Sequence, residues 1–409
     1  GGRAEALLRG SALSHLPGML VAARQPMTPF RRLVAIAGLC CASLLRAQSF
    51  VVDAANGPGT DFTSIAAAVQ TVPDGAVLRI RAGAYAPFAI AGKGLRLLAE
   101  ANVRVLQPLF GVGITISSLA ANQTVVLHGL RVASANNTPA PVSLTCSNAQ
   151  GAIVLDGLIP GQGGILALRA TGCDRLFVRG GVGWRTMEFA NSHAVVENCS
   201  VSGIGWVAVS LPTVTVANGT LQWVDSTVDG SVALNGTSVA TIQLQQADLR
   251  LLGSSLVRNA LGPFCIAGSG RVRLDPAVRV TLLNGGSGVG AIDPALAPLV
   301  KQMPVLTTAV TAASASASLV GRAGDLALVT VSLPGPRLAV AGFQDLFWID
   351  TSVAGPLTFG VLGSTPFPAA LPLPPGRLDG VRAMWQAVTW DQAADWQVSN
   401  PSVAVLNRP

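Results

Sequence analysis

Residues Val51–Glu100 read VVDAANGPGTDFTSIAAAVQTVPDGAVLRIRAGAYAPFAIAGKGLRLLAE, and this stretch predicts the architecture of most of the chain. It contains a polar turn, a short amphipathic helix and two strands joined by Gly-rich turns. Thr63–Val72 places apolar residues on one face at helical spacing, with Asp61 or Thr63 expected as its cap. This order is typical of the first coil of a right-handed parallel β-helix, whose open end a short helix covers.

A loose repeat extends the solenoid beyond this stretch, through short β-rich runs bounded by Gly, Asn, Asp and Pro. The pattern Leu127-His-Gly-Leu-Arg-Val recurs at spacings of 28, 41, 27 and 28 residues, starting at Leu155, Val196, Trp223 and Leu251. A fixed period of this size predicts stacked coils, each burying its apolar face against its neighbours. We expect the gap of 41 to hold one additional, shorter coil containing Leu176–Val182. A β-sandwich with chance similarity between strands is the other interpretation.

The segment GPGTDFTSIAAAVQTVPDGAVLRIRAGAY, residues 57–85, resembles the opening of pectinesterase-like proteins in the pectin lyase-like β-helix superfamily. The resemblance covers residues 50–283 as architecture and implies a right-handed parallel β-helix. It is specific only over residues 51–98. The Q-D-T, D-F-I-F-G and G-R-P-W motifs of pectinesterase-like enzymes are missing from the expected β-helix, and no D-D pair occurs in the chain. The resemblance therefore implies the fold without the family's catalytic residues.

Composition agrees with a folded chain that has no nucleic-acid partner. Half of the 409 residues are hydrophobic and 11% are charged, so there is ample apolar surface to bury. The net charge of +7 depends on residues 1–47, which hold six Arg and one Glu. Without them, 21 basic residues oppose 19 acidic ones, a net charge of +2. A basic patch for nucleic acid is not indicated.

Residues 1–47 are expected to be an over-extended start followed by a signal peptide. Met27-Thr-Pro-Phe-Arg-Arg supplies a positive segment, Leu33–Leu45 an apolar run, and Leu45-Arg46-Ala47 a cleavage site. We therefore expect a protein that is secreted, periplasmic or at the cell surface, with no transmembrane span in the mature chain. The Arg-rich, Lys-poor composition indicates a bacterial source. A core helix or a retained anchor is the alternative.

The rest of the chain divides into a β-helix over residues 48–284, a linker over 285–302 and a β-sandwich-like module over 303–409. Seven or so short strands alternate with Pro/Gly turns in that module. Its tryptophans favour sandwich core over a sugar-binding platform; they are Trp348, Trp385, Trp390 and Trp396. A sorting or anchoring role is an alternative function for the module.

Cysteine spacing predicts contacts between coils. Cys146, Cys173 and Cys199 are spaced by 27 and 26 residues, close to the coil period. Equivalent residues of successive coils lie about 4.8 Å apart, so at least two of the three should stack. A disulfide and a ladder of buried thiols both remain open. No Cys/His cluster indicates zinc, and we expect no metal and no cofactor, with calcium binding left open.

One group of charged and aromatic residues offers the materials of a sugar-binding groove. The catalytic candidates are Asp174, Arg179, Glu188 and Glu197. The ligand-binding candidates are Arg175, Arg185, Trp184 and Trp206. A solvated face with ordinary ion pairs is the simpler interpretation, and His193 fits a structural role better than that of a base.

Two function classes follow from these patterns. The first is a non-catalytic β-helix protein for surface attachment, extracellular structure or glycan binding, with a polysaccharide or cell-surface glycan as partner. The second is a divergent polysaccharide lyase or glycoside hydrolase. The second requires Asp174, Glu188 and Glu197 to converge in one groove.

Overall fold

The structure is a computed structural model, and it divides the chain into two compact units. The solenoid unit comprises Ala47–Gln302, Gly376–Val381 and Val405–Pro409, and the C-terminal unit is formed by Met303–Pro375 and Arg382–Ala404. The described residues are 48–107, 113–134, 140–161, 164–203, 211–230, 239–260, 262–282, 286–311, 313–340, 343, 346–350, 354–373, 378–390 and 396–408. The expected signal segment, residues 1–47, lies outside them.

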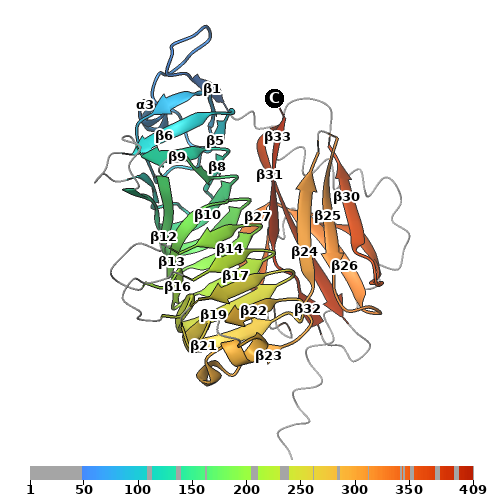
Figure 1. The fold of residues 1–409 in the computed structure, drawn as a ribbon. Helices are drawn as coiled ribbons and strands as arrows, with labels where there is room; N and C mark the ends of the chain where they lie inside the picture. The colour runs from blue at the N-terminus through green and yellow to red at the C-terminus, as the bar shows by residue number, and fades with distance from the viewer. Residues whose placement is uncertain are drawn as a thin grey trace, which may run out of the picture. The chain divides into compact units, whose positions relative to one another are not determined.

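The solenoid unit is a parallel β-solenoid of about 8 turns, as predicted (Figure 1). Each coil has up to three sides. The first side holds β4 (Ala89–Ala91), β7 (Ile114–Ser117), β13 (Trp184–Ala190) and β16 (Val214–Ala217). The second side holds β1 (Ser49–Val52), β2 (Val77–Ile80), β5 (Arg96–Ala99), β8 (Thr124–His128), β14 (His193–Glu197) and β17 (Thr220–Val224).

Four long strands run through the corner between the first and second sides. They are β10 (Ala140–Asp156), β12 (Gly164–Arg179), β19 (Ile242–Leu252) and β21 (Ile266–Leu274). The third side holds β3 (Gly83–Tyr85), β6 (Val103–Gln107), β9 (Arg131–Ser134), β11 (Ile159–Pro160), β15 (Ser200–Ser202), β18 (Thr227–Asp229), β20 (Leu256–Asn259) and β22 (Arg279–Leu282). Each coil between the two ends therefore pairs its strands with those of the coils before and after it.

An inward-facing ladder on the second side confirms the predicted repeat. The paired positions, one in each of the stacked strands, are Phe50, Leu78, Leu97, Leu127, Leu155, Val178, Val196, Trp223, Leu251 and Leu274. Val178 lies 23 residues after Leu155 and 18 before Val196, so the gap of 41 holds one additional coil, as expected. These apolar side chains stack into one continuous core.

One corner of the solenoid is built from residues in the left-handed conformation. Asn198 (φ 53°) and Asp225 (φ 46°) occupy a column that also contains glycines of neighbouring coils. The backbone N–H of Asn198 donates to the carbonyl of Val224, one coil on, at 3.1 Å. Glycine adopts this conformation freely, and Asn and Asp tolerate it better than other residues. The Gly, Asn and Asp residues that bound the strands in the sequence are therefore corner residues.

The predicted helix is present and shorter than expected: α3 spans Ile65–Thr71. Its cap is Ser64, which accepts from the N–H of Ala67, whereas Asp61 was one of the caps that the sequence suggested. Asp61 instead accepts the N–H of Val51 at 2.7 Å, which ties the first strand to the turn before the helix. The apolar face of α3 is buried in the solenoid core, as the capping role predicted.

The far end of the solenoid differs from the prediction, because residues 286–302 belong to the solenoid unit and are not a linker. They form two short 3-10 helices, η1 (Gly288–Ala291) and η2 (Pro294–Leu296), followed by β23 (Leu299–Val300), which pairs with β21. Ala291, Ile292 and Leu296 are buried in the solenoid core. Proline and glycine in this segment mark tight turns that close the last coil.

The C-terminal unit is built on antiparallel sheets, as expected. One sheet holds β24 (Val305–Val310), β25 (Ser314–Val320) and β30 (Phe367–Pro372). A second follows the order β29 (Gly355–Val361), β26 (Leu326–Ser332), β31 (Leu378–Trp390) and β32 (Trp396–Val398), and β33 (Ser402–Arg408) pairs with β31. β27 (Pro334–Ala339) and β28 (Leu346–Ile349) form a two-stranded pair. No helix in the described part of the chain is long and apolar enough to cross a membrane.

Candidate functional site

The predicted catalytic carboxylates lie on different sides of the solenoid. Glu188 is on the first side, where it accepts a hydrogen bond from Arg169 at 2.7 Å. Glu197 is buried at the end of a second-side strand, with its Oε1 atom 3.8 Å from Nε of Arg179. Asp174 lies in β12 at the corner between those two sides. The convergence that acid/base chemistry requires is not met by this set.

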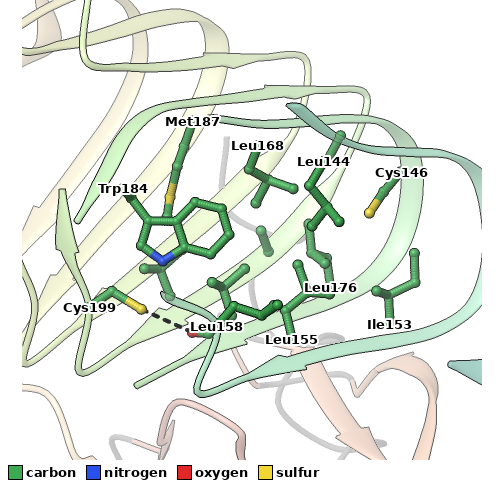
Figure 2. Packing of buried hydrophobic residues seen from close by; sticks show 14 of the residues in the cluster. Leu144, Cys146, Ile153, Leu155, Leu158, Leu168, Leu176, Trp184, Met187 and Cys199 are labelled. Atoms are coloured by element: carbon green, nitrogen blue, oxygen red, sulfur yellow. Dashed lines mark hydrogen bonds between the residues drawn. The ribbon is translucent and has the colours of Figure 1, made fainter. Parts of the chain in front are cut away.

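Two of the predicted ligand-binding residues are structural. Arg175 is 2% exposed and its Nη2 donates to the carbonyls of Ala121 and Gln150, the latter at 3.0 Å. Trp184 is fully buried inside the coil beside Leu168 and Met187 (Figure 2). Both predictions are wrong, because an arginine that satisfies turn carbonyls and an inward-facing indole cannot reach a ligand on the surface.

The remaining candidates do not restore a groove. Arg185 donates to Oγ of Ser202 at 3.2 Å, and His193 shares a hydrogen bond with Thr220 at 2.8 Å. These contacts join neighbouring coils. Trp206 falls outside the described residues.

The prediction that at least two of the three cysteines stack is wrong. Cys146 pairs with Ala170, and Cys173 pairs with Ala149. Cys199 lies at another corner, and Figure 2 shows it on a different side of the interior from Cys146. The cysteine spacings of 27 and 26 residues gave a wrong prediction because the two coils in this region are 23 and 18 residues long.

The four cysteines of the described chain are free and buried, which contradicts a disulfide among them. Burial raises the pKa of Cys173 to about 11 and that of Cys199 to about 12, because the low-dielectric interior disfavours a thiolate. Burial also raises the pKa of Cys146 well above its usual value. Such thiols are poor nucleophiles and poor metal ligands at neutral pH.

A charged row that the sequence analysis missed runs along the second side, one residue per coil. His128, Asp156, Arg179 and Glu197 occupy the same register position in four successive coils. Nδ1 of His128 lies 2.8 Å from Oδ2 of Asp156, and Arg179 pairs with Glu197. Each of the four directly precedes a left-handed corner residue, in the pairs HG, DG, RG and EN. In the sequence, this charged row could have been found from a charged residue or His followed directly by Gly or Asn at the end of each second-side strand.

Charged residues elsewhere on the solenoid also form ion pairs between neighbouring coils. Arg258 pairs with Asp229 at 2.5 Å, and Arg271 with Asp248 at 2.6 Å, in each case between neighbouring coils. The carboxylates of these pairs are therefore engaged by arginines. Within the described residues, no group of three or more His, Cys, Asp or Glu could hold a metal ion.

The tryptophans of the C-terminal unit divide into two classes. Trp348 and Trp385 are buried, which confirms the sandwich-core interpretation for these two. Trp390 and Trp396 are partly exposed and stack on each other, with ring centroids 4.8 Å apart and planes 21° apart. The ring of Phe359 follows at 5.8 Å from Trp390.

These rings share one face of a sheet because of strand register. Leu326 of β26 pairs with Val361 on one side and with Trp390 on the other. Trp390 in turn pairs with Trp396 of β32. Leu326 and Leu328 of β26 point to this face, and the alternate residues of β26 point to the opposite, buried face, since side chains alternate along a strand. We call this surface the aromatic face; it consists of Leu326, Leu328, Phe359, Val361, Trp390 and Trp396.

The aromatic face is the apolar surface in the C-terminal unit most suited to a ligand. Phe359 is 45% exposed and Val361 60% exposed, although both are large hydrophobic residues. Contiguous exposed apolar side chains mark interaction sites more often than isolated ones do. The sequence offered the tryptophans as a signal, but only the register shows that Phe359 joins them.

Comparison of the chain with models of known protein families gives no match, and comparison with curated proteins gives none. The fold is compatible with a parallel β-helix, and a fold alone does not determine an activity. Function must be inferred from the residues of the two surfaces described above.

Proposed function

We propose that the protein is a secreted bacterial β-helix protein without catalytic activity, which binds glycans or attaches to glycan-bearing surfaces through the aromatic face. The observation that carries this proposal is the partly exposed stack of Phe359, Trp390 and Trp396. Pairing of the solenoid carboxylates with arginines of neighbouring coils supports the absence of acid/base chemistry.

Aromatic rings suit sugars for electrostatic and geometric reasons. The face of an aromatic ring carries partial negative charge, and the C–H groups of a pyranose carry partial positive charge. Rings that are already packed against one another lose little conformational freedom when a ligand arrives. The stacked Trp390–Trp396 pair provides this preorganisation.

Substitutions on the aromatic face test the proposal. We expect Phe359→Ala and Trp390→Ala to weaken glycan binding about tenfold or more, since the first removes one to a few kcal/mol of apolar contact and the second removes the ring packed against Phe359. Binding is measured by glycan array and by co-sedimentation with insoluble polysaccharides. The control is Val320→Ala, because Val320 is 50% exposed in the other sheet of the same unit. Unchanged binding by both face variants, or turnover of a polysaccharide, contradicts the proposal.

Export is the second part of the proposal and is tested separately. The positive segment and apolar run within residues 1–47 support cleavage after Ala47. N-terminal sequencing of protein recovered outside the cytoplasm should begin at Gln48. Recovery of the full chain in the cytoplasm contradicts it.

A further inference from the structure

We infer that the ligand of the aromatic face is an uncharged polysaccharide and that Phe359 is the ring that contacts it. This inference rests on the proposed function. It divides the stack into one contact residue, Phe359, and two positioning residues, Trp390 and Trp396.

Ring contacts support that division. Trp390 has ring neighbours in Phe359 and Trp396, and Trp396 has them in Trp390 and Phe343. Among the described rings, Phe359 contacts one other, and it is the most exposed member of the stack. Much of the ring surface of the tryptophans is therefore covered by neighbouring rings, whereas part of the Phe359 ring stays accessible to a ligand.

The surface around Phe359 continues its apolar character. Val361 lies two residues further along the same strand and so on the same face, about 7 Å away. Leu328 pairs with Phe359, and Leu326 with Val361, on the neighbouring strand. A stable protein partner uses about 20–30 residues on each side. Three apolar side chains beside one open ring match a sugar chain better than a protein surface.

Charge decides the class of glycan. β26, β29 and β32 carry no charged residue, and the charged residues of β31, Asp379 and Arg382, lie at the end of the strand away from Trp390. Asp325 before β26 is buried, and Arg322 in the preceding turn is exposed. Recognition of acidic sugars relies on converging Arg and Lys donors. The described face offers apolar contact without such a group, which favours an uncharged chain.

The first experiment compares two uncharged with two acidic polysaccharides. Protein comprising residues 48–409 is incubated with cellulose and chitin, and with immobilised polygalacturonate and alginate, at low and high salt. We expect retention on an uncharged polymer that is unchanged by salt, because no ion pair forms. Phe359→Ala and Phe359→Leu should weaken retention about tenfold or more, and Phe359→Tyr should restore it. Val320→Ala should bind as the parent does.

The second experiment separates contact from positioning. Two tryptophans stacked at 4.8 Å couple their strong indole transitions, which gives a paired signal in far-ultraviolet circular dichroism. Trp390→Ala should lose that signal and weaken binding. Phe359→Ala should weaken binding as much while it keeps the signal. Loss of the signal in Phe359→Ala, or full binding by Trp390→Ala, overturns the assigned roles.

The outcomes separate failure of the uncharged-glycan assignment from failure of glycan binding as a whole. Binding confined to acidic polymers, lost at high salt and in Arg322→Gln, overturns the inference and leaves glycan binding in place. Uncharged-polymer binding that Phe359→Leu retains in full overturns the role of the ring. No binding to any polysaccharide overturns the proposed function together with the inference.

Discussion

Single polar side chains connect successive coils at the solenoid corners, and Ser226 is the clearest case. The N–H of Cys199 donates to Oγ of Ser226 at 2.9 Å, and the N–H of Ser226 lies 3.3 Å from Oγ of Ser255 in the next coil. Ser226 in turn donates to the carbonyl of Val224 at 2.7 Å. The three side chains occupy equivalent corner positions and are buried.

Removal of one hydroxyl from this column should destabilise the fold. Ser226→Ala leaves the buried N–H of Cys199 without its acceptor, so we expect the free energy of unfolding to fall by about 1–3 kcal/mol. Denaturant unfolding measures it. The control is Ser254→Ala, because Ser254 directly precedes Ser255 in the next coil but is exposed. Equal stability of the two variants contradicts the bridging role.

Buried ion pairs should contribute more to the free energy of unfolding than exposed ones do. Glu197→Gln removes the partner of Arg179 at a buried position, and we expect a loss of about 3 kcal/mol in the free energy of unfolding. Glu188→Gln breaks an exposed pair with Arg169 and should cost below about 1 kcal/mol. The comparison uses the same unfolding assay. A larger loss for Glu188→Gln than for Glu197→Gln would contradict the greater contribution of the buried pair.

At the scale of elements, the helix that closes the solenoid depends on a lysine from a later turn. Nζ of Lys93 donates to the carbonyls of Val69, Gln70 and Val72, at 3.0, 3.1 and 2.8 Å. These carbonyls belong to the C-terminal end of α3, where orphan acceptors and the negative end of the helix dipole meet. The lysine therefore holds the helix over the first coil.

Lys93→Met should loosen this cap while it keeps most of the side-chain volume. We expect a loss of about 1–3 kcal/mol, since charged hydrogen bonds are stronger than neutral ones. Hydrogen exchange of the α3 amides should rise more than that of strands in the middle of the solenoid. Gln70→Ala, an exposed substitution in the same helix, serves as control. Unchanged exchange in α3 argues against the capping role.

Elements with a strong local pattern were predictable, and those that depend on partners were not. The α3 segment, the inward ladder and the additional short coil all follow from apolar spacing and corner residues. β25, β30 and β32 give little β signal in the sequence, because they consist of a Ser/Ala alternation, a run with two prolines and a stretch of three residues. Tertiary pairing, and not local propensity, makes them strands.

The candidate site was harder to predict for the same reason. Sequence proximity grouped Asp174, Glu188 and Glu197, but coils of 23 and 18 residues place neighbours in sequence on different sides. The aromatic face combines residues more than 30 positions apart, Phe359 with Trp390 and Trp396. Their contact follows from the pairing of β26 with both β29 and β31, which a single sequence does not specify.

At the scale of the whole molecule, buried thiols couple stability to alkaline pH. Unfolded cysteine titrates near pH 8.5, whereas Cys173 and Cys199 have pKa values of about 11 and about 12 in the fold. Between pH 9 and 11 the unfolded chain loses protons that the folded chain keeps. The free energy of unfolding should therefore fall as pH rises, by about 1–2 kcal/mol per buried cysteine at pH 10.

Unfolding curves at pH 8 and pH 10 measure this coupling in protein comprising residues 48–409. Cys199→Ser should reduce the pH dependence, because its hydroxyl does not ionise in this range. Titration with a thiol reagent at pH 8 should find four reactive thiols after unfolding and few before it. Fewer than four thiols in the unfolded, unreduced protein would reveal a disulfide and contradict the structure.

The corner column of Gly180, Asn198, Asp225 and Gly253 has a consequence for how such a gene can change. Equivalent corners are separated by 18, 27 and 28 residues, so coil length varies while the corner conformation recurs. In-frame loss of the codons for residues 199–225 would join Asn198 to Ser226, the neighbour that Asp225 has now. Recombination between corner codons would thus shorten the protein by one rung, about 4.8 Å, without a new kind of junction. Lineages carrying this gene are expected to differ in length by whole rungs.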